Sequence, residues 1–173
     1  MNRYLDRIIR AAKLDAALYE EVEADRTAMG QALGVVVIAA LADGIGYIGS
    51  FDLARVVMGV INGIGGWMLW ASIIWLVGVK IIRNPSTRTD IPELLRTLGF
   101  ASAPGILIIF AVIPGLRGLV AIVVSLWMLG AMIVAVRQAL DYTSTGLAVA
   151  VCFLGLVVKV MFYIGLRILF GFV

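Results

Sequence analysis

The sequence predicts an all-α integral membrane protein, a five-span helical bundle with an N-terminal amphipathic helix in the cytoplasm. Hydrophobic residues make up 62% of the 173 residues and charged residues only 14%, whereas charged residues are roughly a quarter of soluble domains. The mean hydropathy is +1.07. Long apolar segments also alternate with short polar loops, as expected for helices that cross a hydrocarbon core about 30 Å thick.

Residue usage argues against several classes of function. The chain has no His and one Cys, Cys152, so it lacks the commonest general base and metal ligand and cannot close a disulfide within itself. It has no phosphate-binding or dinucleotide-binding Gly motif, no nucleophile with its base and no dense Lys/Arg block. We therefore expect a non-enzymatic protein with no catalytic or metal site, no cofactor and no nucleic-acid partner.

Residues 1–27 form the predicted amphipathic segment, and residues 28–173 a single transmembrane domain. The segment holds no apolar core of seven residues, so we expect it to stay in the mature protein. We expect its basic half to lie on anionic lipid and its acidic half to face away from the membrane or toward a basic partner; a solvated face is the alternative. The apolar positions recur at helical spacing at Leu5, Ile8, Ile9, Ala12, Tyr19 and Val22, with Arg3, Arg7, Arg10 and Lys13 early and Glu20, Glu21, Glu23 and Asp25 late.

Apolar length predicts the spans. Residues 98–137 are almost unbroken in apolarity and would extend about 60 Å as a helix, twice what one crossing needs, so they must cross twice with a hairpin at Pro114–Gly118. The first of these two crossings is short, and it is either a full span, which fits the alternation of loop charges, or a re-entrant one. The five spans are predicted at about residues 28–49, 56–79, 98–113, 116–136 and 147–170.

Basic residues predict the orientation. Most Lys and Arg residues lie in the N-terminal segment, in the loop after the second span with its turn at residues 84–86, and in the loop after the fourth span. Loops rich in Lys and Arg stay in the cytoplasm, so we expect the N-terminus in the cytoplasm and the C-terminus outside. The basic residues predicted on the cytoplasmic side are Arg3, Arg7, Arg10, Lys13, Arg26, Lys80, Arg83, Arg88, Arg96 and Arg137.

The polar turn before the third span has its own helix-start pattern. Asp90 is a suitable N-cap, Glu93 stands three residues later as in a capping box, and Pro92 suits the first helical turn. Gly99 and Pro104 then interrupt the new helix. Because Pro104 lacks an amide hydrogen and clashes with the preceding turn, we expect a kink or a break there.

Two stretches resemble a known family of membrane proteins. LLRTLGFASAP, residues 94–104, resembles the Gly-aromatic-x-x-x-Pro element of the Yip1 family, and AVRQALDYTSTGLAVAV, residues 135–151, resembles the stretch before the last span in prokaryotic members. The resemblance implies a protein with several spans that docks a partner, here in a prokaryotic cytoplasmic membrane. The Asp-Leu-Tyr-Gly-Pro element implicated in the Rab contacts of eukaryotic members has no counterpart, and Phe100 stands where Tyr is frequent, so Rab binding is not implied.

Two functions remain open. The first is a scaffold or accessory subunit that docks a membrane-protein partner, or a second copy, at its cytoplasmic face; for the helix start and kink, plain helix capping is the alternative explanation. Arg137 and Asp141, four residues apart, can also form an ion pair. The predicted docking residues are Asp90, Pro92, Glu93, Arg96, Gly99, Phe100, Pro104, Arg137 and Asp141.

The second function is a small transporter or channel. Asp43 and Lys159 are the ionisable residues deepest in the predicted membrane, at similar depth, and Asn62 is polar within the second span. Asp43 and Lys159 form either a buried salt bridge that fixes the first span against the fifth or an ion or proton site. The pairs Gly30/Gly34 and Gly59/Gly63 have GxxxG spacing, and we expect them to pack within the chain rather than at a dimer face.

Overall fold

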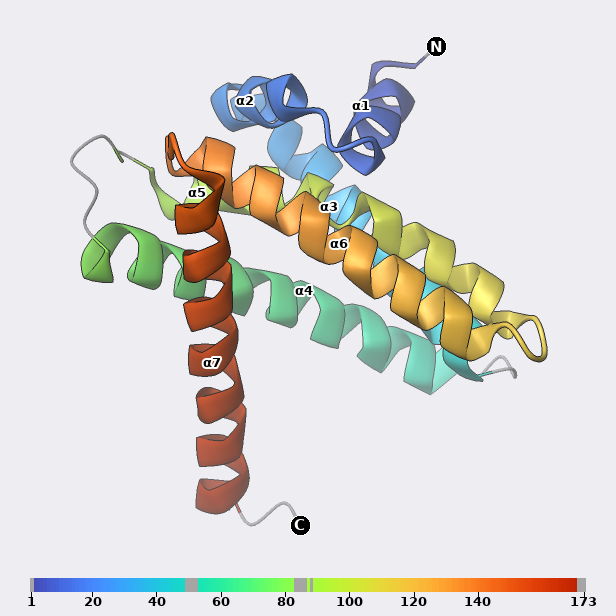
Figure 1. Cartoon of the computed structure of the whole chain (residues 1–173). Helices are drawn as coiled ribbons and strands as arrows, with labels where there is room; N and C mark the ends of the chain where they lie inside the picture. Colours follow the sequence, from blue (N-terminus) through green and yellow to red (C-terminus); the bar gives the residue numbers. More distant parts are fainter. Residues whose placement is uncertain (1, 49–52, 83–86, 88, 171–173) are drawn as a thin grey trace.

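The computed structural model describes residues 2–48, 53–82, 87 and 89–170, and Figure 1 shows that these form a helical bundle. Arg83, the predicted turn at 84–86 and Arg88 lie outside the described residues. Within the described ranges there are helices and turns but no strand. The helices are α1 (Arg3–Ala12), α2 (Ala16–Ala24), η1 (Arg26–Ala28), α3 (Met29–Ile48), α4 (Leu53–Trp75), the π-helix η2 (Leu76–Ile81), α5 (Ile91–Phe100), the 3₁₀-helix η3 (Ala103–Val112), α6 (Arg117–Ala139) and α7 (Thr145–Phe170).

Four helices are long and apolar enough to cross a membrane, and α5 with η3 makes a fifth if the bent pair is one span. The four are Arg26–Gly46, Val56–Ile81, Arg117–Ala139 and Thr145–Phe162. These helices confirm the predicted all-α integral membrane bundle.

The helix start predicted at Asp90 is confirmed, because Asp90 is the N-cap of α5, which begins at Ile91. The chain then bends by 41° between α5 and η3, and η3 lies within the predicted third span, residues 98–113. Pro104 stands in the first turn of η3, where its missing amide hydrogen leaves no bond unmade. The expected break is confirmed, and it falls just before the proline.

The N-terminal segment is two helices, not the single amphipathic helix that the spacing predicted. Leu14 adopts a left-handed conformation with φ of 62° and ends α1. The amides of Leu14 and Asp15 donate to the carbonyls of Ala11 and Arg10 at 3.0 and 3.1 Å, a Schellman closure that usually uses glycine. Asp15 then caps α2 by accepting from the Ala17 amide at 3.1 Å. A leucine gives no sequence sign of such a reversal.

Close helix packing builds the core around α3. A Cβ on Gly46 would lie 2.4 Å from the backbone oxygen of Ile108, and one on Gly63 would lie 2.8 Å from the Cβ of Ala40. Gly34 similarly underlies Tyr4 of α1. Gly30 and Gly59 have open space instead. One glycine of each GxxxG pair therefore packs within the chain.

The C-terminal half of α7 diverges from the bundle. Figure 1 shows α7 crossing α4 and then extending away from it. The crossing is close at Gly155, where a Cβ would lie 3.1 Å from Ile74 and 3.3 Å from Trp70. Beyond it, apolar side chains such as Met161 are exposed, as expected of a helix that faces lipid.

Candidate docking surface on α2, α5 and α6

The predicted capping box at the start of α5 is present. The Asp90 side chain accepts from the Glu93 amide at 2.8 Å, and the Glu93 carboxylate accepts from the Asp90 amide at 3.0 Å. Pro92 lies in the first turn. Asp90 and Pro92 are exposed and Glu93 is half-buried, so the cap leaves these three residues at the surface.

Arg96, a predicted docking residue, is instead buried, with 5% of its surface exposed. Its Nε donates to the carbonyls of Val22 and Glu23 at 3.0 and 3.1 Å, and its Nη2 also donates to Glu23. These are among the last carbonyls of α2, which have no partner within the helix. A cation there also complements the helix dipole, so Arg96 fastens α2 to α5.

The Gly-aromatic-x-x-x-Pro element also lies inside the fold. Phe100 is fully buried, and Pro104 is buried in η3. A Cβ on Gly99 would lie 2.7 Å from the Ala32 Cβ and 3.1 Å from its backbone oxygen. Gly99 thus allows α5 to approach α3. These three predicted docking residues pack the bundle and are not at its surface.

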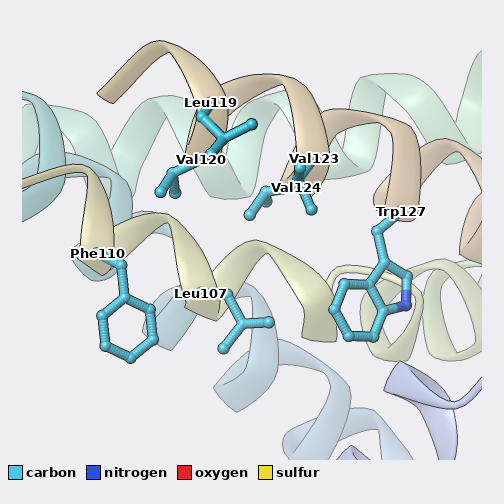
Figure 2. Close-up of a pocket in the computed structure, with 7 residues that line it drawn as sticks. All are labelled: Leu107, Phe110, Leu119, Val120, Val123, Val124 and Trp127. Atoms are coloured by element: carbon cyan, nitrogen blue, oxygen red, sulfur yellow. The ribbon is translucent and has the colours of Figure 1, made fainter. Parts of the chain in front are cut away.

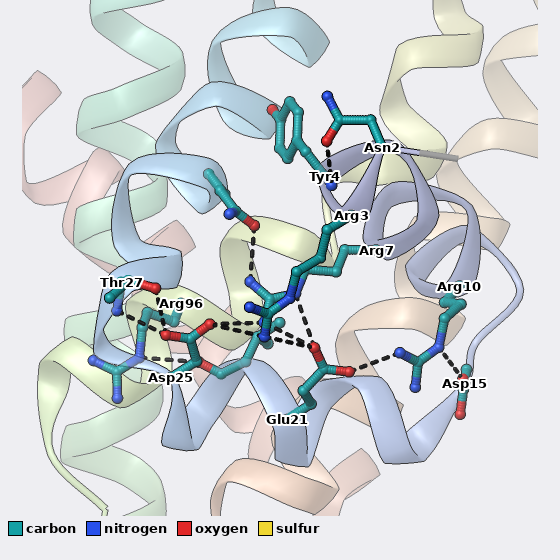
Figure 3. A network of polar contacts seen from close by, with 12 residues as sticks. Asn2, Arg3, Tyr4, Arg7, Arg10, Asp15, Glu21, Asp25, Thr27 and Arg96 are labelled. Atoms are coloured by element: carbon teal, nitrogen blue, oxygen red, sulfur yellow. Dashed lines mark hydrogen bonds and ion pairs between the residues drawn. The ribbon is translucent and has the colours of Figure 1, made fainter.

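Arg7 is the centre of a second buried network, shown in Figure 3. Its side chain is 1% exposed and donates to Glu21 at 2.8 and 3.0 Å, to Asp25 at 2.7 Å and to Gln31 at 2.9 Å. Arg10 joins the same network through Glu21, at 2.7 Å.

The network changes the expected arrangement of the N-terminal segment. The segment folds back, so that Arg7 and Arg10 of its basic half pair with Glu21 and Asp25 of its acidic half. The acidic half was expected to face away from the membrane or toward a basic partner, and its basic partners here belong to the same segment. The pKa of Asp25 falls to about 2, mainly because Thr27 and then Arg7 donate to its carboxylate. The sequence spacing gave no sign that Arg7 would be buried.

Arg137 and Asp141 are not paired as predicted. The described residues hold no ion pair between them, and the Nε of Arg137 donates to the Tyr142 carbonyl at 3.3 Å. Asp141 takes the left-handed conformation, φ 52°, that ends α6 in a Schellman closure. This conformation accounts for the unpaired arrangement, because a pair four residues apart requires a continuous helix.

Four carboxylates gather beside these elements, and we call Glu20, Glu23, Glu93 and Asp141 the acidic surface. Glu23 is half-buried, and burial raises the pKa of its carboxyl to about 7, with further upward contributions from Asp141 and Glu93 that exceed the opposing effect of Arg96. Glu20 accepts from the Gln138 amide of α6 at 2.6 Å. The acidic run in α2 was visible in the sequence, but its proximity to Glu93 and Asp141 was not.

The three polar residues within the spans are not brought together. Asp43 is exposed on α3, and Asn62 is exposed on α4. The ammonium of Lys159 lies 5.6 Å from the centroid of the Trp70 ring, a cation–π contact between α7 and α4. No ion pair joins Asp43 to Lys159 in the described part of the chain.

Comparison with known proteins gives one match. The model of the family described as the Yip1 domain matches residues 16–166, which include α2 and almost all of the membrane helices. No curated protein and no solved structure matches the chain. Among the described residues, no group of three His, Cys, Asp or Glu side chains is arranged to hold a metal ion.

Proposed function

The chain belongs to the Yip1 family, and from that premise we propose that it is a non-enzymatic scaffold or accessory subunit that docks a basic segment of a partner protein on the acidic surface. The observation that carries the proposal is that α2, α5 and the end of α6 bring carboxylates to one part of the surface. Arg96 of α5 donates to the Glu23 carbonyl at the end of α2, and Gln138 near the end of α6 donates to Glu20. Lys and Arg side chains are the chemistry that complements such a surface, and they steer association from a distance.

The carboxylates are available to a partner. No Lys or Arg forms an ion pair with any of the four within the residues that the structure describes. Glu20 and Asp141 are exposed, and Asp90 and Pro92 extend the same surface at the start of α5. Arg96, Gly99, Phe100 and Pro104 then act below the surface, by holding α2 and α3 against α5.

The same surface fits the proposed orientation. The start of α5, the end of α6 and the N-terminal helices are on the side that carries most of the basic residues in the sequence, which we assign to the cytoplasm of a prokaryotic cell. A partner that docks there is either a cytoplasmic protein or the cytoplasmic segment of another membrane protein.

The transport alternative has less support. A conduction path needs polar groups that line one interior route, whereas Asp43 and Asn62 are exposed and Lys159 contacts the Trp70 ring. On the scaffold proposal, the Asp43→Asn variant reconstituted in liposomes leaves proton and ion flux unchanged. Loss of a flux that the original chain supports would favour transport.

The test of docking is gentle detergent extraction of the tagged chain from its membrane, followed by native mass measurement. The test variant is Glu93→Gln with Asp141→Asn. Glutamine keeps the capping box and asparagine tolerates the left-handed conformation, so the two changes remove charge without removing the local structure. The matched control is Asp6→Asn, which removes a carboxylate of α1 outside the acidic surface.

We expect a stoichiometric foreign subunit on the original chain and on the control, absent from the test variant and released by added salt. A Lys/Arg-rich peptide derived from that subunit should bind the original chain and not the test variant. A subunit retained by the test variant would refute docking on this surface. A pure monomer or homo-oligomer in every sample would refute the foreign-partner proposal.

A further inference from the structure

An apolar groove runs between η3 and α6, shown in Figure 2. Its volume is about 240 Å³. Residues three apart in a 3₁₀-helix are eclipsed, so Leu107 and Phe110 stand in one row along η3. The opposite wall is the face of α6 on which residues recur three and four apart. The full lining is Leu107, Phe110, Leu119, Val120, Val123, Val124 and Trp127.

The length and the chemistry of the groove suit an alkyl chain. Leu119 and Trp127 are eight residues apart on α6, which is about 12 Å along the helix. None of the lining side chains carries a charge. The groove therefore fits an extended alkyl chain rather than a polar ligand.

The position of Lys13 in the chain is beside one end of the groove. The Trp127 indole donates to the carbonyl of Ala12 at 2.7 Å, and the Leu14 side chain reaches α6 beside Gly130. Lys13 stands between these two residues in the chain, so its backbone is held near the Trp127 end of the groove. Lys13 is exposed, and none of the described carboxylates forms an ion pair with it.

The surface of α1 on this flank also suits a membrane. Leu5 and Ile9 lie four residues apart, hence on one face, and are 52% and 42% exposed. Exposed apolar residues beside a lysine are typical of a helix at the boundary between lipid headgroups and acyl chains.

We propose that the groove binds one acyl chain of an anionic phospholipid whose phosphate pairs with Lys13. The apolar lining takes the chain, and the ammonium selects the headgroup charge. Bound in this way, the lipid joins α1 to η3 and α6. The site is separate from the acidic surface, so it stands or fails independently of the proposed docking function.

The test uses the full chain in vesicles with brominated acyl chains, which quench tryptophan fluorescence on contact. Brominated phosphatidylglycerol should quench Trp127 more than brominated phosphatidylcholine with the same chains. The contribution of Trp127 is isolated with Trp127→Phe, because three other tryptophans remain. In Lys13→Gln we expect the preference for phosphatidylglycerol to fall about fivefold, as for the loss of one basic residue near an anionic surface.

A second experiment blocks the groove with a larger side chain. Leu119→Trp places a larger ring in the lining, and native mass measurement should then show less retained phosphatidylglycerol. The matched control is Leu129→Trp, on the same helix, at a position that does not line the groove and is similarly exposed, 51% against 62%. Val123→Phe replaces the test variant if thermal unfolding shows that Leu119→Trp is not folded.

Three results would overturn the proposal. The first is equal quenching of Trp127 by the two brominated lipids together with no change in Lys13→Gln. The second is equal phosphatidylglycerol retention in the groove-blocking variant and its control. The third is a dimer that the groove-blocking variant dissociates while lipid retention is unchanged, since the groove would then be a contact between copies.

Discussion

The buried arginines and the acidic surface use charge in opposite ways. Arg7 and Arg96 are almost fully buried, and their guanidinium groups donate to carboxylates or to helix-end carbonyls. Among the described residues, no Lys or Arg forms an ion pair with the acidic surface, and burial and crowding hold the pKa of Glu23 near 7. In a chain with so few charges, the paired groups connect helices, and the unpaired ones are left for another molecule.

The same difference is found within one short segment, α5 with its N-cap, which has an exposed side and a buried side. Asp90, the N-cap of α5, and Glu93 lie at the surface, whereas Arg96, Gly99 and Phe100 are buried in the bundle. The Gly-aromatic-x-x-x-Pro element is therefore part of the packing that presents the surface. Substitutions on the two sides of α5 should have different effects, and the following predictions test that separation in order of size.

The largest expected effect is from Arg7→Leu. Removing one member of a buried ion network leaves its partners desolvated without a counter-charge, so we expect a loss of about 3 kcal/mol in the free energy of unfolding. Thermal unfolding in detergent measures it. Arg3→Met is the matched control, because Arg3 reaches the same carboxylates only at 3.5 Å from a side chain that is 70% exposed. The loss in the free energy of unfolding of Arg3→Met should stay below about 0.5 kcal/mol. An equal loss in both variants would show that the burial of Arg7 is not the reason for its larger effect.

A smaller effect is expected from Gly99→Ala. The added Cβ meets Ala32, including its backbone oxygen, so α3 and α5 must separate, at a cost of about 2 kcal/mol. Gly59→Ala is the control, because nothing lies within 4 Å of a Cβ there. It should be neutral or gain up to about 1 kcal/mol from helix propensity. Denaturation of the two variants side by side gives the comparison, and a neutral Gly99→Ala would show that the helices are not packed so closely.

The smallest effect, from Glu23→Gln, depends on pH. The folded pKa of Glu23 is raised from 4.5 to about 7, so between these values the folded chain binds more protons than the unfolded chain. The stability contributed by this carboxyl is present below pH 4.5 and is lost as the pH rises through 7. Glutamine stays neutral, so it should stabilise the protein at pH 8 and have little effect near pH 4.

The size of the stabilisation expected from Glu23→Gln follows from the partial exposure of Glu23. After allowance for solvent screening we expect about 1 kcal/mol at pH 8, which is a rise of about 2–4 °C in Tm. Melting curves at the two pH values measure it. The same gain at both would mean that the charge of Glu23 is not the cause.

Sequence patterns predicted the features that depend on neighbouring residues. The capping box of Asp90 and Glu93 is one, because a helix start is set within four residues. The break near Pro104 is another. Spans and helical class followed from apolar length. The partners of Arg96, by contrast, are carbonyls 73 and 74 residues away, which no local pattern specifies.

The two helices at the N-terminus show a second limit. Amphipathic spacing continues through the segment, and the reversal at Leu14 uses a residue that rarely takes a left-handed conformation. Only the pairing of Arg7 with Glu21 and Asp25, which requires the chain to fold back, accounts for the arrangement. The same long-range packing brings Glu23 toward Asp141, so the acidic surface could not be found from the sequence.

The separation between supporting and docking residues is tested most directly with variants on the two sides of α5. For each variant, the mass of the complex and the Tm are measured on the same sample. For Glu93→Gln with Asp141→Asn we expect the foreign subunit to be lost while the Tm is kept. For Arg96→Ala we expect a Tm lowered by several degrees, with any loss of the subunit following unfolding. The opposite pattern would contradict the separation between supporting and docking residues. In that pattern, Arg96→Ala keeps its Tm and still loses the subunit, whereas Glu93→Gln with Asp141→Asn retains the subunit.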